Sequence, residues 1–377
     1  MKYLVMFVAF NVLKLLVLET FIYWLSSKSM RSRKGFLLQI FFGAIKYCIT
    51  HFQFKNMAFQ KKKLSLLFYA IFTYTALVAQ NAPQTNISNG EIDATIYLPD
   101  PNTGYYRGVR FDWSGVVPRL RFKGHDYFGK WFKTYDSKSH DAIMGPVEAF
   151  DPLGYQDAQV LGLFTKVGVG VLEKRESTDY HFSKAYKIRD GGEWEIAKDK
   201  DEVSFTHTLN TGDYPYIYIK TIRLENNKMI IEHELTNTGK NGIDTKVYNH
   251  NFFVIDNDPI GPGYSIELAF DITGDTSGLR QFAVADGNKI RYVKPLGEKD
   301  YQYVGDMVGF GSTFDEYLFR IENRNTGAGV KFSCDRPLSK LVFWSMNKTL
   351  CPEPYIDIKV EPGKSFTWTI VYEFYTL

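Results

Sequence analysis

The sequence has few cysteines and almost no excess of charge of either sign. Only Cys48, Cys334 and Cys351 occur in 377 residues, which is too few for a disulfide framework. A Cys334–Cys351 disulfide and two free thiols both stay open. The formal net charge is +3, so the composition gives no reason to expect a nucleic-acid partner.

Long apolar runs with the period of a helix are also scarce after residue 90. Aromatic residues make up 16% of the chain, with 25 Tyr and 30 Phe, and such residues favour strands. Residues 216–239 are typical of a β-hairpin, because two runs of β-branched and aromatic residues flank Glu225–Lys228. Similar runs, separated by Gly, Pro and Asn turns, continue to the C-terminus. We therefore predict one large all-β domain over residues 91–377, a sandwich of large sheets.

The segment before this domain has the layout of a signal peptide. Basic Lys61–Lys63 precede the apolar run Leu64–Ala79, which ends in a small residue before polar Gln80. Because a signal peptide normally starts a chain, we expect translation to begin at Met57. Residues 57–80 are then the signal peptide, and the domain lies outside the cytoplasm, in the periplasm or the medium.

The remaining N-terminal residues allow two interpretations. Residues 1–56 are a hydrophobic extension that we attribute to a misassigned start. The alternative is a membrane anchor in the first 27 residues, although Lys14 and Glu19 interrupt its apolar run. We interpret residues 81–90 as a polar linker.

A histidine between two asparagines stands out in the strand-like stretch YNHNFFVID. In the alternation of a strand, Tyr248, His250 and Phe252 share one face, and Asn249 and Asn251 share the other. Burying an unpartnered polar group costs roughly 2–7 kcal/mol, so His250 needs a reason to be there. Either His250 lies on a face that forms the floor of a cleft, or it is a core histidine that forms a hydrogen bond with a backbone carbonyl.

A glutamate between two prolines is the second unusual feature. Pro352 and Pro354 restrict the backbone around Glu353. We predict a stiff loop that holds the carboxylate, as a general base requires. The alternative is an exposed turn glutamate.

Together these stretches resemble the galactose mutarotase-like (aldose 1-epimerase) superfamily over about Gly104 to Phe374. The resemblance rests on segments that occur in the family's order. They are an Asn-His strand, a Glu-Pro segment, a Pro-Gly turn, a final strand ending Tyr-x-Phe, and an arginine in an opening hairpin: Asn249–Phe253, Cys351–Pro354, Pro362–Gly363, Tyr372–Phe374 and Arg110.

The resemblance implies a fold, a reaction and a set of site residues. The fold would be a large antiparallel β-supersandwich of the galactose mutarotase-like type. Glu353 would take the proton of the anomeric hydroxyl, and His250 would protonate the ring oxygen from the opposite side of the sugar. Arg110 and Asn249 would bind the substrate. The reaction needs no metal and no organic cofactor.

One element of the family pattern is missing. Family members usually carry an earlier second histidine before a glycine pair, and no His-Gly pair occurs here. Lys166 stands near that position and is a candidate sugar ligand. His125 and His140 are alternative donors, although both read as ordinary loop histidines. Glu148 is a further cleft candidate, because a Gly-Pro pair before it suggests a shaped loop.

Sugars also stack their C–H faces on aromatic rings. Trp113, Trp131, Trp194 and Trp344 could form such platforms, with core packing as the alternative. We retain Trp344 as a substrate-binding candidate.

The Asp256–Gly263 turn concentrates oxygens, but it lacks the spacing of a calcium loop. We interpret it as an Asx-rich turn and predict no metal.

Three functions agree with these observations. We favour an exported aldose 1-epimerase-like isomerase that acts on a mono- or oligosaccharide. The alternatives are a non-catalytic carbohydrate-binding protein and a polysaccharide lyase, for which Arg107, Arg110 and Arg119 would suit an acidic sugar. We expect membrane contact only through the N-terminal segment. The sequence does not set the oligomeric state.

Overall fold

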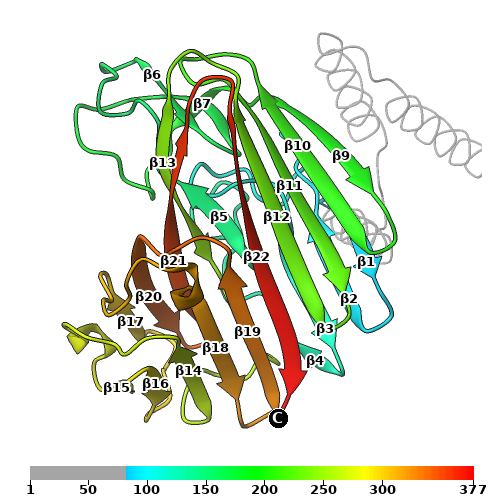
Figure 1. Ribbon diagram of the computed structural model, residues 1–377, viewed down its shortest axis with the longest axis vertical. Coiled ribbons are helices and arrows are strands. Elements are labelled where there is room, and N and C mark those ends of the chain that lie inside the picture. The colour runs from blue at the N-terminus through cyan, green and yellow to red at the C-terminus, as the bar shows by residue number, and fades with distance from the viewer. Residues whose placement is uncertain (1–81) are drawn as a thin grey trace, which may run out of the picture. The chain divides into compact units, whose positions relative to one another are not determined.

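The computed structural model describes residues 82–377, which are built almost entirely from antiparallel strands (Figure 1). Within this range the helices are two short 3₁₀ turns, η1 (Ser277–Leu279) and η2 (Phe314–Glu316). The predicted all-β class with large antiparallel sheets is confirmed. The strands are β1 (Gln84–Ser88), β2 (Ile92–Tyr97), β3 (Val116–Phe122), β4 (His125–Asp126), β5 (Val147–Phe150), β6 (Leu163–Lys166), β7 (Gly170–Glu173), β8 (Lys187–Asp190), β9 (Glu193–Lys198), β10 (Glu202–Leu209), β11 (Tyr216–Glu225), β12 (Lys228–Asn237), β13 (Ile243–His250), β14 (Tyr264–Leu268), β15 (Ala283–Asp286), β16 (Lys289–Tyr292), β17 (Tyr301–Val304), β18 (Leu318–Asn323), β19 (Ala328–Cys334), β20 (Lys340–Met346), β21 (Thr349–Val360) and β22 (Ser365–Thr376).

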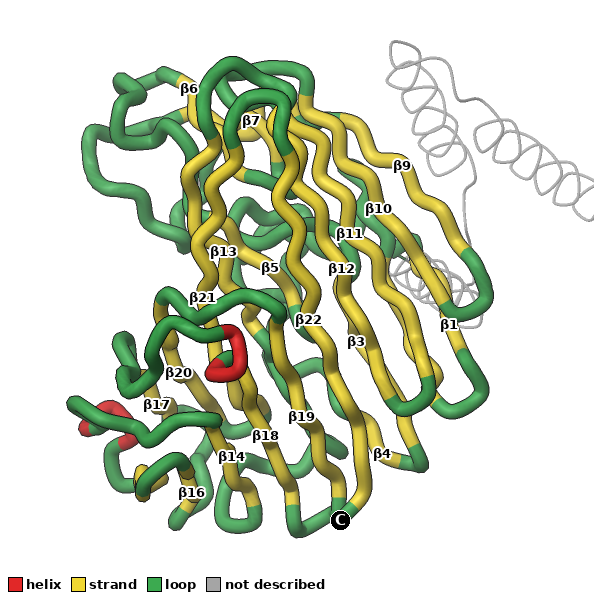
Figure 2. Tube along the Cα trace, viewed as in Figure 1, coloured by secondary structure: helices red, strands yellow, loops and turns green. Residues whose placement is uncertain are grey.

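Two sheets dominate the arrangement (Figure 2). A ten-stranded sheet has the order β15-β16-β14-β18-β19-β22-β12-β11-β10-β9, and a five-stranded sheet has the order β17-β20-β21-β13-β5. A four-stranded sheet (β1 to β4) and a three-stranded sheet (β6 to β8) complete the set. The last two long strands therefore belong to different layers, because β21 lies in the smaller sheet and β22 in the centre of the larger one.

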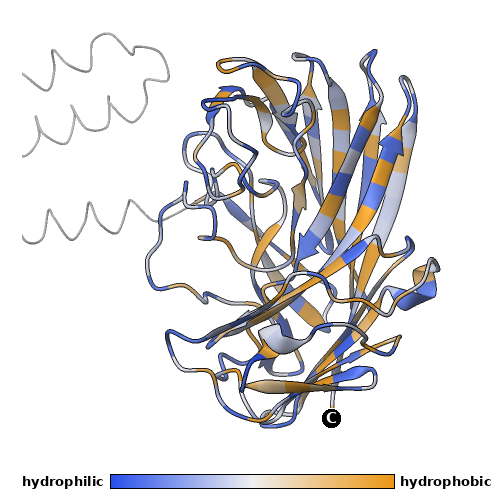
Figure 3. Cartoon of the chain, turned by 90° about the vertical axis from the view of Figure 1, so that its left-hand side faces the viewer, coloured by the Kyte–Doolittle hydropathy of each residue, from blue (hydrophilic) through white to orange (hydrophobic). Residues whose placement is uncertain are grey.

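Alternation of apolar and polar residues produces these strands, as the banding in Figure 3 shows. In β10 every second residue is buried, and β11 follows the same pattern. The predicted hairpin is confirmed: β11 pairs with β12 from Tyr216↔Asn237 to Glu225↔Lys228. Asn226 in its turn has a φ of 51°, a left-handed conformation that asparagine tolerates better than most residues.

The main core fills the space between the ten-stranded sheet and the smaller sheets. It contains inward residues of the large sheet, such as Tyr218 and Trp368, and of the five-stranded sheet, such as Phe343 and Ile356. A second apolar cluster covers the other face of the five-stranded sheet and joins it to loops around Phe111. The five-stranded sheet is therefore covered on both faces, and the candidate site lies on the side of the second cluster.

The domain begins earlier than predicted. Gln84–Ser88 forms β1 and pairs with β2, and Ile87 is buried in the main core, so the linker prediction for residues 81–90 is wrong over this strand. The proposed extension (1–56) and signal peptide (57–80) lie outside the described residues, as does Cys48. Between residues 82 and 377, no helix is long and apolar enough to cross a bilayer.

The two cysteines of the domain are free and buried. Cys334 belongs to the main core and Cys351 to the second cluster, so the disulfide alternative does not hold.

Candidate functional site

His250 and Glu353 meet on the side of the second cluster. The pairing of β13 with β21 runs from Ile243↔Val360 to Tyr248↔Tyr355. Two residues further along the same register, His250 stands opposite Glu353. Their Nε2 and Oε1 atoms are 3.3 Å apart, and both side chains are more than nine-tenths buried. The two residues are thus in contact in the structure, and their catalytic roles stay a prediction.

Glu353 is held by a strand, and the stiff loop that we predicted is not there. It lies inside β21 and pairs with Val342 of β20. Since alternate strand residues direct their backbone groups to opposite neighbours, Pro352 and Pro354 face the β13 side. Prolines have no N–H to donate, so they are tolerated where the ladder is interrupted. The two prolines coincide with an interruption of the β13–β21 pairing, which resumes in the same register at Phe253↔Leu350.

The two asparagines have a structural task on the opposite face. Asn251 donates to the carbonyl oxygen of Pro352 at 2.7 Å, in place of the missing ladder bond. The Tyr372 hydroxyl donates to Asn251 at 2.7 Å, and Asn249 donates to the same hydroxyl. This network ties β13 to β21 and to β22 directly behind His250.

Aromatic rings enclose the imidazole of His250. The Phe252 ring is stacked on it, with centroids 3.7 Å apart, and Phe111 and Trp344 approach edge-on at 5.6 and 5.8 Å. Burial, and then the charge of Arg110, lower the pKa of His250 well below its ordinary value. The imidazole is therefore neutral near pH 7. Its Nδ1 has no hydrogen-bond partner among the described residues, so no second group fixes the tautomer.

Burial has the opposite effect on the carboxyl group. It raises the pKa of Glu353 to about 7, although the positive charge of Arg110 opposes the shift. Arg110 is itself buried: its Nε donates to the Tyr248 hydroxyl at 3.0 Å, and it forms an ion pair with Asp141. At neutral pH the imidazole of His250 is therefore free to accept a proton, and the carboxyl of Glu353 holds its own proton about half of the time.

The spacing differs from the expected arrangement. We predicted that the two groups stand on opposite sides of a sugar ring. At 3.3 Å they contact each other, and no pyranose ring fits between them. Any substrate must reach the pair from one edge.

Other predicted residues divide between the two faces of the five-stranded sheet. Arg110, Lys166 and Trp344 lie on the side of His250. Lys166 is buried, donates to the carbonyl of Phe150 and has its pKa lowered to about 7 by burial. Glu148 lies on the opposite face, so its prediction as a cleft residue is wrong.

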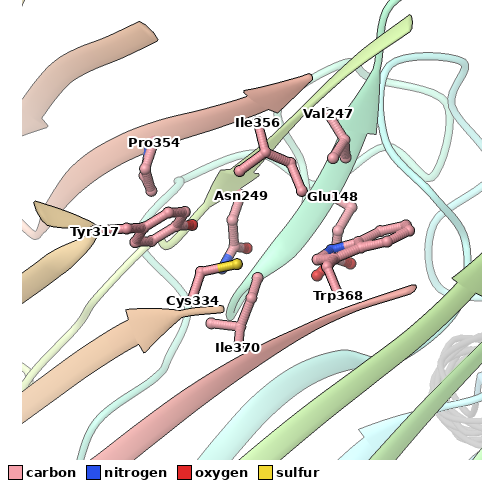
Figure 4. A pocket seen from close by; sticks show the side chains of 9 residues that line it. All are labelled: Glu148, Val247, Asn249, Tyr317, Cys334, Pro354, Ile356, Trp368 and Ile370. Atoms are coloured by element: carbon pink, nitrogen blue, oxygen red, sulfur yellow. The ribbon is translucent and has the colours of Figure 1, made fainter. Parts of the chain in front are cut away.

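The same correction applies to Asn249. Its side chain points into the main core, where it and Glu148 line a cavity of about 10 Å³ (Figure 4), about the space of one water molecule. Asn249 is therefore not placed to bind a substrate held by His250.

Sequence reasoning missed the ion cluster that Glu148 joins. Lys220 forms an ion pair with Glu148 and a second one with Asp112, whose carboxylate is 3.5 Å from the Lys220 ammonium. The ring of His233 lies 3.2 Å from the carboxylate of Glu148. We call these four residues the Lys220 cluster. Burial alone would raise the pKa of Glu148, but Lys220 and His233 outweigh it and lower this pKa to about 2. Lys220 also donates to the carbonyl of Ser114 at 3.0 Å, which anchors the loop that carries Arg110.

The alternative histidines are placed differently from each other. His140 lies 2.9 Å from Asp141, the partner of Arg110, at the rim of the site. His125 forms a hydrogen bond with Asp256 at 2.8 Å and is not near the site. Asp258 accepts bonds from the side chains of Asn323 and Asn325, which tie its turn to the β18–β19 connection. In the described part of the chain, no group of three or more His, Cys, Asp or Glu side chains is arranged to hold a metal ion.

Comparison with known proteins gives structural likenesses only. No family model matches the sequence, and no curated protein matches it. Similar solved structures include an aldose epimerase homologue from C. elegans, with 16% identity, a TM-score of 0.49, and coverage of 79% of this chain and all of that one. A galactose mutarotase-like protein from Lactobacillus casei is also similar, with 13% identity, a TM-score of 0.46, and coverage of 78% of this chain and all of that one. So is one from Clostridium acetobutylicum, with 15% identity, a TM-score of 0.46, and coverage of 78% of this chain and 95% of that one.

These structures bear the family name to which the sequence resemblance pointed. Their TM-scores are below 0.5 and their identities are low. What this chain does must therefore be inferred from its own side chains.

Proposed function

We propose that the protein is an aldose 1-epimerase-like enzyme that interconverts the anomers of a reducing sugar. The observation that carries this proposal is the contact between His250 and Glu353, a buried imidazole and a buried carboxyl whose pKa is raised to about 7. A pair that holds one proton near neutral pH can give a proton at one point and take one at another. Ring opening of a cyclic hemiacetal requires both transfers.

The short distance suits this reaction when the sugar approaches edge-on. The anomeric hydroxyl oxygen and the ring oxygen of a hemiacetal are bonded to the same carbon. They are therefore closer to each other than the 3.3 Å between Nε2 of His250 and Oε1 of Glu353. The spacing of the two catalytic atoms therefore matches one atom to each of the two oxygens.

The pKa order determines which group gives the proton first. In the resting site the proton resides on Glu353, because His250 has the lower pKa. Glu353 then protonates the ring oxygen while Nε2 of His250 takes the proton of the anomeric hydroxyl. The bond between the anomeric carbon and the ring oxygen breaks, and the carbonyl forms. Rotation of the aldehyde and reversal of both transfers give the other anomer, so these initial roles are the reverse of those that the resemblance implied.

Arg110 contributes charge at this site. Its guanidinium lowers the pKa values of both groups. The pKa of Glu353 therefore stays near neutral pH, although burial alone would raise it further. Trp344 and Tyr355 belong to the partly buried residues beside the site, and we propose that their rings receive the C–H face of the sugar.

The test is the rate at which freshly dissolved sugars reach optical equilibrium with and without the protein. The panel includes hexoses and pentoses, together with their methyl glycosides, which have no anomeric hydroxyl group and so no hydroxyl proton to remove. The proposal predicts acceleration for at least one free sugar and for no methyl glycoside. A folded protein that accelerates no sugar in the panel contradicts it and favours a carbohydrate-binding role.

We also propose that the domain is exported. The support is the basic and apolar layout of Lys61–Ala79. N-terminal sequencing of the protein recovered outside the cytoplasm should give a first residue close to Asn81. A cytoplasmic protein with an intact N-terminus would contradict this proposal.

A further inference from the structure

The sheet face that carries Glu353 continues to the edge of the five-stranded sheet. Cys351, two residues before Glu353 on β21, pairs with Trp344 of β20, and Trp344 pairs with Tyr303 of β17. Tyr301 follows on the same face, because side chains two residues apart in a strand point the same way. Figure 1 shows β17 and β20 side by side at this edge. We call Trp344, Tyr303 and Tyr301 the aromatic row.

Exposure rises along this face toward the edge. Cys351 is fully buried and Trp344 is partly buried. Tyr303 is 53% exposed and Tyr301 is 44% exposed. The row thus leads from the buried pair of His250 and Glu353 to solvent.

The exposure of the tyrosines does not come from a loosely attached strand. On the opposite face of β17, Gln302 is fully buried and accepts a bond from the Ser345 hydroxyl at 2.8 Å. Val304 belongs to the main core. The strand is therefore anchored, and its two large aromatic side chains are presented to solvent on a fixed support.

We propose that the aromatic row is a binding platform for an oligosaccharide whose reducing end lies at His250 and Glu353. This inference rests on the proposed function and names its substrate class: a sugar chain of at least three units. Aromatic rings stack on the C–H faces of sugars, and tyrosine hydroxyls can bond sugar hydroxyls at the ring edge. Neighbouring strands are about 4.8 Å apart, so rings on β20 and β17 can receive successive units of one chain.

A charged side chain completes the far end of the row. The guanidinium carbon of Arg280 lies 4.2 Å from the ring centroid of Tyr301. Its N–H groups can donate hydrogen bonds to the hydroxyl oxygens of a sugar. A ligand that combines flat apolar faces with many hydroxyls fits rings followed by donors better than a purely apolar partner does.

The experiment measures binding without turnover. Calorimetric titration of the Glu353→Gln protein uses malto-, cello-, xylo- and galacto-oligosaccharides, each from monosaccharide to tetrasaccharide. The same series is measured with Tyr303→Ala added. Phe314→Ala is the matched control, because Phe314 is 55% exposed but lies in η2, outside the aromatic row.

The expected result is that affinity in one series rises with chain length. Tyr303→Ala should lower the ratio of tetrasaccharide to monosaccharide affinity by about tenfold, the size of one lost stacking contact, and Phe314→Ala should leave this ratio unchanged. Affinity independent of chain length overturns the inference. So does a Tyr303→Ala protein that binds tetrasaccharide as the parent does.

Failure of the proposed function looks different. If no sugar is interconverted but tetrasaccharide binding is lost in Tyr303→Ala, the platform stands and the epimerase proposal falls. If sugars are interconverted with no dependence on chain length, the reverse holds.

Discussion

Replacing Glu353 by glutamine should change how stability depends on pH. Glutamine resembles the protonated carboxyl in shape but does not titrate. The pKa of Glu353 rises from the ordinary 4.5 to about 7 on folding, mainly because of burial. A group with a raised pKa contributes stability that is fully present below its unfolded value and is lost as pH rises through its folded value. The parent should therefore lose stability between about pH 4.5 and 7, and the Gln variant should not show this loss.

The size of the effect follows from the shift. Each pKa unit corresponds to about 1.4 kcal/mol, so the difference in unfolding free energy between variant and parent should increase by about 3 kcal/mol across this interval. Urea unfolding at about pH 4.5 and at about pH 8 measures it. Glu361→Gln is the control, because Glu361 is exposed and its replacement should produce no comparable change. A difference that does not vary with pH would refute the assignment of Glu353 as a buried acid.

Three further outcomes follow from the same geometry. Arg110→Met should raise the pKa of Glu353, because it removes a positive charge. Since the reaction needs a protonated Glu353, the high-pH limit of the pH–rate profile should then move to higher pH. A move to lower pH would refute the role of this charge. Lys220→Met should reduce the free energy of unfolding, measured by urea titration, by about 3–5 kcal/mol, because it leaves Glu148 buried without its main partner. Adding Glu148→Gln should restore part of this loss. A Lys220→Met protein as stable as the parent would exclude the Lys220 cluster as a buried ion network. His250→Gln should lower the rate of anomer interconversion about 10²- to 10⁴-fold while circular dichroism stays unchanged, and a fully active variant would show that the imidazole is not needed.

Local alternation predicted much of the fold because the orientation of strand side chains depends only on position along the strand. It placed His250 with Tyr248 and Phe252 on one face, as the structure has them. It also applies to Lys220 and His233, which occupy inward positions in β11 and β12. These two residues were missed because their charge suggested solvent, and because their partner Glu148 is distant in sequence, 72 residues from Lys220.

Long-range register accounts for the remaining differences. Pro352 and Pro354 read as a loop, because proline usually interrupts a ladder. In the structure they lie in a strand whose pairing on one side is interrupted between Tyr355 and Leu350, and no local pattern reveals where the pairing with a neighbouring strand is interrupted. The same limit applies to the distance between His250 and Glu353. Resemblance indicated that they act together, but only the shared register of β13 and β21 shows that they are in contact.

The central claim is that His250 and Glu353 move protons across the hemiacetal of a sugar. The most direct measurement is the polarimetric rate of anomer interconversion for the parent, Glu353→Gln and the exposed control Glu361→Gln, over a panel of free sugars. The account predicts acceleration by the parent and the control, and its loss in Glu353→Gln. Equal acceleration by Glu353→Gln, or none by the folded parent on any sugar, would contradict it.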